Sequence, residues 1–134
     1  MPPELELVRA WLSKGHSDLL LGERAVTGEP ALTDLACFHA QQAMEKALKG
    51  LMVFRGIEPP RTHLLATLFQ SCGPIDDRLS ALEEQLVGLS VFAVTARYPD
   101  LEEPPSRERA RQALDLARQA FMIILENLPD EVRP

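Results

Sequence analysis

Arg97 and Tyr98 are neighbouring residues whose side chains suit a phosphate-bearing ligand. The planar guanidinium of an arginine donates paired hydrogen bonds to phosphate oxygens, and a tyrosine ring can stack on a base. The sequence leaves an alternative open for each. Arg97 can instead stabilise the C-terminal end of the helix before it, and Tyr98 can pack with its hydroxyl group in water. The pair is a candidate ligand-binding site, and Arg97 is the best candidate for a catalytic group.

A second polar set, Gln42, Glu45 and Lys49, shares one face of a predicted helix because its members are three and four positions apart. Glu45 and Lys49 stand in the favourable order for an ion pair along a helix, which alone is an adequate structural explanation for them. Gln41 and Gln42 lie beside a strong apolar stripe and are less easily explained. We hypothesise that this strip faces a groove that holds Arg97 and helps to bind a phosphate-bearing ligand.

The chain has three histidines. His63 can serve as a ligand or an acid–base group, with the alternative of a local hydrogen bond beside Thr62. His39 and His16 are interpreted as surface or packing residues. No histidines, cysteines or carboxylates show the spacing of a metal site, so no metal and no cofactor are predicted.

Composition favours one helical domain over residues 1–134. Apolar residues make up 46% of the chain, charged residues 25% and aromatic residues only 5%. Leu and Ala dominate the apolar set, and unbranched side chains lose little freedom in a helix. A length of 134 residues suits one domain with its own core.

The formal net charge of −6 argues against avid, non-specific binding to nucleic acids, although a local basic surface can still bind RNA. Arg107, Arg109 and Arg111 form a basic run, which is interpreted as a solvated helix start. Cys37 and Cys72 are expected to be reduced packing residues of a cytoplasmic protein. The first residues lack the features of a signal peptide, and no segment is apolar enough to cross a bilayer.

Apolar residues recur at helical spacing in five segments. The predicted helices are residues 4–25, 32–55, a short one at 63–71, one from 76 or 77 past 93, and a last one that Ser106 caps and whose apolar stripe ends at Leu128. Thr62 is the expected N-cap of the short helix, and Gly56 the expected residue past the end of the second. Gly15 and Gly22 weaken the first helix. We therefore predict an all-α, antiparallel up-and-down bundle of four long helices and one short helix, without a sheet.

Residues 36–49, ACFHAQQAMEKALK, resemble the helix-two signature of the HEPN family, named for nucleotide binding in higher eukaryotes and prokaryotes. Residues 11–20 resemble the family's opening helix, and residues 60–63, PRTH, its proline-threonine-histidine turn. Residues 96–100, ARYPD, resemble its arginine-tyrosine-proline-aspartate segment. These matches follow the family's order and span nearly the whole chain.

The resemblance implies a helical bundle that commonly forms a homodimer. Many relatives are small prokaryotic proteins that act with a separate minimal nucleotidyltransferase, often as a toxin–antitoxin pair. Ribonuclease members carry an arginine followed four to six residues later by a histidine. This chain has no histidine after Arg97 through Pro105, and Leu64 replaces the family's aspartate after the turn histidine. Since metal-free RNA cleavage needs groups that accept and donate protons, strong catalysis is not expected.

Three functions are compatible with this sequence. The first is a HEPN-like homodimer that binds a nucleotide or RNA and acts with a minimal nucleotidyltransferase, through Arg97, Tyr98, Gln42, Glu45, Lys49 and His63. The second is a metal-independent ribonuclease that uses Arg97 with a substitute for the missing histidine, for which His63 is the nearest candidate. The third is a helical adaptor without any ligand.

Overall fold

The computed structural model describes residues 1–99 and 103–134, and every regular element in these ranges is helical. The α-helices are α1 (Pro3–Thr27), α2 (Thr33–Phe54), α3 (Leu65–Cys72), α4 (Asp77–Val87), α5 (Phe92–Thr95) and α6 (Arg107–Glu126). Two 3₁₀ turns, η1 (Gly88–Val91) and η2 (Asp130–Val132), complete the order. The all-α prediction is confirmed.

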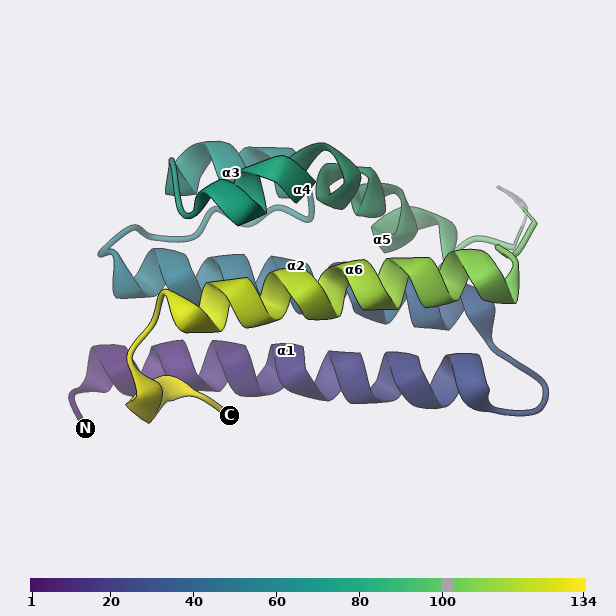
Figure 1. Ribbon diagram of the computed structural model, residues 1–134, viewed down its shortest axis with the longest axis horizontal. Coiled ribbons are helices and arrows are strands. Elements are labelled where there is room, and N and C mark those ends of the chain that lie inside the picture. Colours follow the sequence, from purple (N-terminus) through teal and green to yellow (C-terminus); the bar gives the residue numbers. More distant parts are fainter. Residues whose placement is uncertain (100–102) are drawn as a thin grey trace.

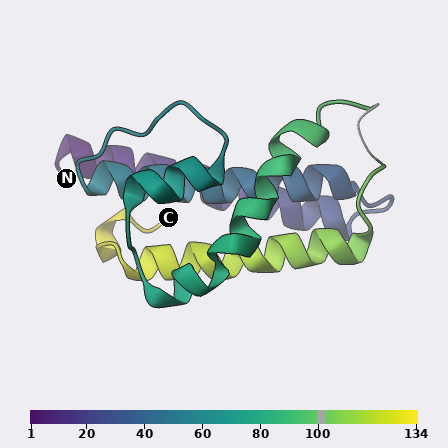
Figure 2. The same cartoon turned by 90° about the horizontal axis from the view of Figure 1, so that it is seen from above.

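Helices α1, α2 and α6 lie side by side and form the long layer of the molecule (Figure 1). Helix α1 runs antiparallel to both α2 and α6. Helices α3, α4 and α5 lie over this layer, and Figure 2 shows α4 crossing it obliquely. The chain thus alternates in direction from α1 to α2, α4 and α6, as the bundle prediction requires.

The predicted fourth long helix is interrupted in the structure. It begins with Asp77, as expected, but a 3₁₀ turn at Gly88–Val91 separates α4 from the four-residue α5. Glycine and serine are weak helix formers, and the Ser90 hydroxyl accepts a hydrogen bond from the Leu65 backbone N–H at 3.0 Å. This contact joins the turn to the start of α3.

Side-chain caps set two of the helix boundaries. Ser106 accepts a hydrogen bond from the Arg109 backbone N–H at 3.0 Å, and Asp76 accepts one from the Arg78 backbone N–H at 2.9 Å. The predicted cap at Thr62 is wrong: α3 begins after Leu64, and the Thr62 hydroxyl instead accepts from the Leu64 N–H at 3.1 Å. The displacement follows from Ser90, which already satisfies the first N–H of α3.

Gly56 follows the last turn of α2 with a φ of 74°, as predicted. Gly15 was expected to weaken the first helix, but the structure shows that it permits close packing between helices. A Cβ atom at Gly15 would lie 2.9 Å from Phe121 Cε2 and 3.2 Å from the Ala43 carbonyl oxygen. Glycine there allows α1 to approach α2 and α6 closely.

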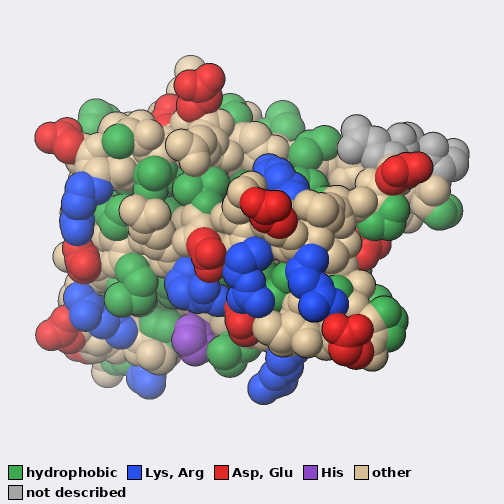
Figure 3. Space-filling view, turned by 45° about the vertical axis from the view of Figure 1, so that its right-hand side comes forward, with side chains coloured by type: hydrophobic (Ala, Val, Ile, Leu, Met, Phe, Trp, Pro, Cys, Tyr) green, Lys and Arg blue, Asp and Glu red, His purple; other side chains and the backbone are tan. Residues whose placement is uncertain are grey.

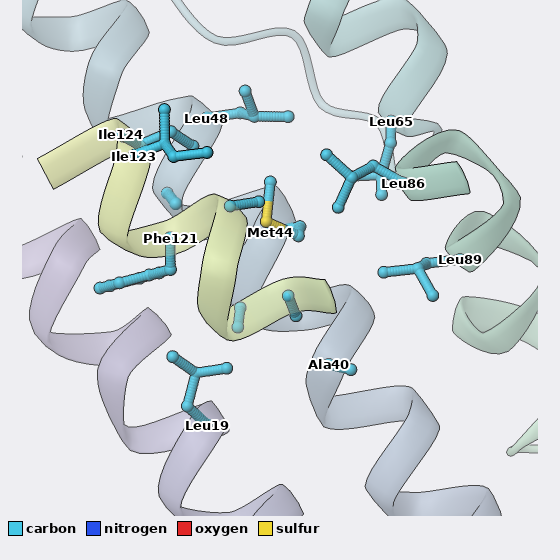
Figure 4. Close-up of a cluster of buried hydrophobic side chains, with 14 of the residues drawn as sticks. Leu19, Ala40, Met44, Leu48, Leu65, Leu86, Leu89, Phe121, Ile123 and Ile124 are labelled. Atoms are coloured by element: carbon cyan, nitrogen blue, oxygen red, sulfur yellow. The ribbon is translucent and has the colours of Figure 1, made fainter. Parts of the chain in front are cut away.

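The core lies both among the three long helices, where Leu19 and Phe121 are found, and between the long layer and the segments α3 and α4, where Leu65 and Leu86 are found (Figure 4). Met44 and Leu48 of α2 are 0% exposed, and Phe121 of α6, which points toward α1, is 2% exposed (Figure 4). The apolar stripe predicted for α6 is buried along its whole length, at Ala110, Ala113, Leu114, Ala117, Phe121, Ile124, Leu125 and Leu128. This core fixes α2 and α6, the helices that carry the polar sites described next.

Candidate functional site

A pocket of about 590 Å³ lies between α5 and the start of α6. These two segments lie toward the same end of the molecule (Figure 1). We call this pocket the α5–α6 pocket. Residues of α2, η1, α5 and α6 and of the segments on either side of residues 100–102 line it: Asp34, Val91, Phe92, Thr95, Ala96, Arg97, Tyr98, Pro99, Glu103, Pro104, Pro105 and Arg109. It therefore contains Arg97 and Tyr98, two of the residues that the sequence indicated. Asp100, the last residue of the ARYPD segment, lies outside the described residues.

Two arginines of this pocket lie over aromatic rings. The guanidinium carbon of Arg97 is 5.5 Å from the centroid of the Phe38 ring, and that of Arg109 is 5.3 Å from the Phe92 ring. Cations at such distances are attracted to the ring faces, which restrains the arginine side chains. Tyr98 is 52% exposed beside them. The pocket thus combines two oriented cations with an accessible aromatic ring.

Two carboxylates, Asp34 and Glu103, also line the α5–α6 pocket. The Asp34 carboxylate accepts a hydrogen bond from the Leu35 backbone N–H at 2.9 Å, which places it at the start of α2. The formal charge of the lining residues is therefore balanced, and a phosphate would be favoured at the guanidinium groups rather than across the whole pocket.

A second polar cluster is built around Glu45, which is 4% exposed. Its Oε2 atom accepts a hydrogen bond from Lys49 Nζ at 3.0 Å, and its Oε1 atom lies 2.8 Å from His63 Nδ1. Gln41 Nε2 lies 3.3 Å from the same Oε1 and donates to the His63 carbonyl oxygen at 3.0 Å. The network fixes the segment before α3 against α2.

Opposing influences act on the Glu45 carboxyl. Burial raises its pKa, but hydrogen bonds from His63, Lys49 and Gln41 and the positive charge of Lys49 together outweigh burial and lower the pKa. The carboxyl is therefore ionised at neutral pH and accepts a hydrogen bond from the Nδ1–H of His63. The His63 side chain is 57% exposed, so the imidazole ring is accessible from solvent while Nδ1 contacts Glu45.

The structure does not bring Arg97 and His63 to one point of α2. Arg97 contacts α2 at Phe38, whereas His63 contacts it at Glu45. These positions are seven residues apart, about 10 Å along the helix axis. Gln42 lies between them and donates to the Gln41 side-chain oxygen at 2.7 Å. Gln42, Glu45, Lys49 and His63 thus form one cluster, while Arg97 and Tyr98 belong to the α5–α6 pocket.

A third cluster joins α1 to α2 and was missed by the sequence interpretation. Asp18 is 5% exposed. Its carboxylate lies 2.8 Å from His39 Nδ1 and 2.6 Å from Lys46 Nζ. A signal existed, because Asp18 lies next to Leu19 and follows Gly15 and Leu12 on the buried face of α1. His39 is therefore a partner of a buried carboxylate rather than a simple surface or packing residue.

The predicted basic run divides between two environments. Arg107 forms an ion pair with Glu29 at 2.9 Å, and Arg111 one with Glu23 at 2.9 Å, so they link α6 to the loop after α1 and to the last turns of α1, respectively. Hydrogen bonds from Arg111, together with Arg118, outweigh burial and lower the pKa of Glu23. Figure 3 shows basic and acidic side chains next to one another on one face of the molecule. Arg109 instead lines the α5–α6 pocket.

Cys37 and Cys72 are both free and buried, as predicted for packing residues. Burial raises the pKa of each thiol to about 11, which keeps both protonated and poorly reactive. Within residues 1–99 and 103–134, no group of three or more histidine, cysteine or acidic side chains is arranged to hold a metal ion. Among the described helices, none has the length and apolar character needed to cross a bilayer.

Comparison with known proteins gives one family match and two structural matches. The family model described as HEPN domain matches residues 8–128. The crystal structure of TT1696 from Thermus thermophilus superposes with a TM-score of 0.73 at 29% identity, covering 90% of this chain and 98% of that one. The structure of ST0689, an archaeal HEPN homologue, superposes with a TM-score of 0.70 at 26% identity, covering 89% of this chain and 95% of that one. A search of curated proteins found no match.

Proposed function

Since this chain belongs to the HEPN domain family, we propose that it binds a nucleotide or RNA in the α5–α6 pocket. Arg97 and Arg109 bind the phosphate, and Tyr98 stacks on a base. The proposal depends chiefly on one observation: the same pocket contains two arginines whose guanidinium groups lie over aromatic rings and a tyrosine that is exposed. Guanidinium groups match the geometry of phosphate oxygens, and stacking on an aromatic side chain is a general way to hold a base.

The cluster of Gln42, Glu45, Lys49 and His63 has a supporting part in this proposal. It begins one turn of α2 beyond Phe38, on which Arg97 rests. A longer RNA that leaves the pocket along α2 would meet Gln42 first and then His63, whose side chain is 57% exposed. Glu45 and Lys49 act as positioning residues here, because both are almost fully buried.

In the cell, the protein acts as a homodimer with a separate minimal nucleotidyltransferase, in the manner of a toxin–antitoxin pair. Family membership supports this part of the proposal. Exposed apolar side chains at Leu35 and Val94, which are not among the lining residues of the α5–α6 pocket, offer contact area for a second copy or a partner. Size-exclusion chromatography with light scattering tests the dimer, and co-purification from the native host tests the partner.

The last part of the proposal is that the protein cleaves RNA weakly or not at all. No histidine follows Arg97 through Pro105, and His63 meets α2 about 10 Å from the position that Arg97 contacts. The ribonuclease alternative makes the opposite prediction. Cleavage of RNA by the purified protein in a chelator, lost in Arg97→Ala, would establish that alternative.

The test of the proposed site is binding of a fluorescent single-stranded RNA and of a labelled nucleotide, measured by anisotropy. Arg97→Ala and Tyr98→Ala are expected to weaken binding about tenfold each, as loss of a charge-assisted contact or a stacking contact does. Arg24→Ala removes the same charge from an exposed position on α1 and is the matched control. Equal binding by the parent and Arg97→Ala would contradict the proposal.

A further inference from the structure

A second pocket lies between α4 and α6, with a volume of about 490 Å³. We call it the α4–α6 pocket. Its lining is Glu84, Gln85, Gly88, Arg109, Gln112 and Leu116. Arg109 is therefore common to this pocket and to the α5–α6 pocket. The Arg109 side chain therefore lies between the two pockets. The proposed function uses the α5–α6 pocket and leaves the α4–α6 pocket without a role.

The α4–α6 pocket runs along one face of α6. Arg109, Gln112 and Leu116 are three and four positions apart, so they follow one face of α6. They span about 10 Å along the helix axis, which is room for one further nucleotide beside the first. Glu84 and Gln85 of α4 also line the pocket, and Gly88, which has no side chain, leaves space there.

The polar groups of the α4–α6 pocket suit a base better than a phosphate. The amides of Gln85 and Gln112 present both donors and acceptors, and the Leu116 side chain adds an apolar surface. Glu84 would repel a phosphate, but its carboxylate can accept a hydrogen bond from the exocyclic amino group of a base. Uracil lacks such a group, whereas cytosine has one.

We infer that the ligand is a single-stranded oligonucleotide, with one base in the α5–α6 pocket, its linking phosphate on Arg109 and the next base in the α4–α6 pocket. The inference rests on the proposed function, since it extends the same site. It assigns Gln112, Gln85 and Glu84 as specificity residues that favour a second base with an amino group.

Substitution of Gly88 can fill the α4–α6 pocket without altering the α5–α6 pocket. Its φ of −59° is open to any residue, and no atom lies within 4 Å of a Cβ built on it. Gly88→Leu should therefore fill the pocket without straining the backbone, while Gly88→Ala adds one methyl group and leaves most of the space. For the polar contact, Gln112→Ala has a matched control in Gln119→Ala, another exposed glutamine of α6 outside both pockets.

The experiment measures binding of pCpC, pUpU and cytidine 5′-diphosphate by calorimetry. The diphosphate carries a charge similar to that of pCpC but has no second base, so it controls for electrostatic attraction. We expect the parent to bind pCpC about tenfold more tightly than the diphosphate, the gain typical of one or two hydrogen bonds to the second base, and more tightly than pUpU. Gly88→Leu should abolish this advantage, Gln112→Ala should reduce it, and neither variant should change the affinity for the diphosphate.

The outcomes separate the two claims. Equal affinity of the parent for pCpC and the diphosphate, with both weakened by Arg97→Ala, would overturn this inference and leave the proposed function standing. An advantage of pCpC that survives in Gly88→Leu would also overturn it. Failure of the parent to bind any of the three probes would overturn the proposed function and the inference together. Thermal melting of Gly88→Leu beside Gly88→Ala checks that the variant is folded.

Discussion

Glu45 has more polar partners than any other residue of the cluster on α2. Lys49, His63 and Gln41 all contact its carboxylate, and both Glu45 and Lys49 are buried. An ion pair removed from water is strongly favourable only while both partners are present, because a remaining lone charge has no solvent around it. The cluster therefore stabilises the fold and also positions the His63 side chain.

Glu45→Ala should destabilise the protein by about 3 kcal/mol, since it leaves the Lys49 ammonium buried and unpaired. Urea unfolding followed by circular dichroism measures the loss. Glu83→Ala, an exposed substitution on α4, is the control and should change the free energy of unfolding by less than about 0.5 kcal/mol. A similarly small effect for Glu45→Ala would show that the network adds little to stability.

Acid should destabilise the protein through the same carboxylates. Contacts with basic side chains lower the pKa of Glu45 and Glu23 below their ordinary value of 4.5. The unfolded chain then binds protons first as the pH falls below 4.5, so stability is fully present above that pH and declines toward the lower folded-state pKa values. Melting temperatures between about pH 7 and about pH 3 should show this decline, and Glu45→Gln should make it shallower. A decline unchanged in Glu45→Gln would contradict the assignment.

At the scale of elements, close approach of α1 to α2 and α6 sets the geometry of the long layer. Gly15 meets Phe121 and the Ala43 carbonyl oxygen, and Gly22 meets the Leu114 side chain. A Cβ atom at either position would force a neighbouring atom to shift, so glycine is favoured there although it lowers the intrinsic stability of a helix. Packing between helices has outweighed local propensity at both positions.

Gly15→Ala should destabilise the protein by about 1–3 kcal/mol, despite the better helix propensity of alanine, because Phe121 and a backbone oxygen occupy the space. Gly88→Ala, in open space with helical backbone angles, should instead be neutral or stabilise by up to about 1 kcal/mol. Chemical unfolding of the two variants side by side makes the comparison. Stabilisation by Gly15→Ala would refute this account of helix packing.

The sequence predicted the elements better than the contacts between them. Periodicity and caps located α1, α2 and α6, since Ser106 and the apolar stripes are local signals. The turn that interrupts the fourth helix depends on Ser90 reaching Leu65, and the displaced start of α3 depends on the same bond. Such contacts join residues far apart in the chain, and a single sequence does not reveal them. Arg97 and Tyr98 could be identified as ligand candidates, but Arg109 could not be separated from the basic run around it.

At the scale of the whole molecule, charge limits how strongly RNA can be bound. The chain carries a net charge of −6, and Arg107 and Arg111 are committed to ion pairs with α1 and the loop after it. The proposed ligand thus meets only Arg97 and Arg109 as phosphate-binding cations among the described lining residues of the α5–α6 pocket. Affinity must then depend on stacking and fit in the pockets more than on long-range attraction.

This balance predicts a shallow salt dependence. Two phosphate contacts to a single strand give a slope of about −1.4 for the logarithm of the binding constant against the logarithm of the salt concentration. Arg97→Ala should reduce the magnitude of that slope by about 0.7. Anisotropy titrations from low to physiological salt measure both. A slope several times steeper would indicate a basic surface other than the one described.

The most direct measurement is nuclear magnetic resonance of isotope-labelled protein titrated with pCpC, following backbone amides and arginine side chains. We expect the largest shifts at Arg97, Tyr98 and Arg109, with further shifts at Gly88 and Gln112 and little change on the exposed face of α1. Shifts concentrated elsewhere, with those of Arg97 and Arg109 unchanged, would contradict the claim that the α5–α6 pocket is the ligand site.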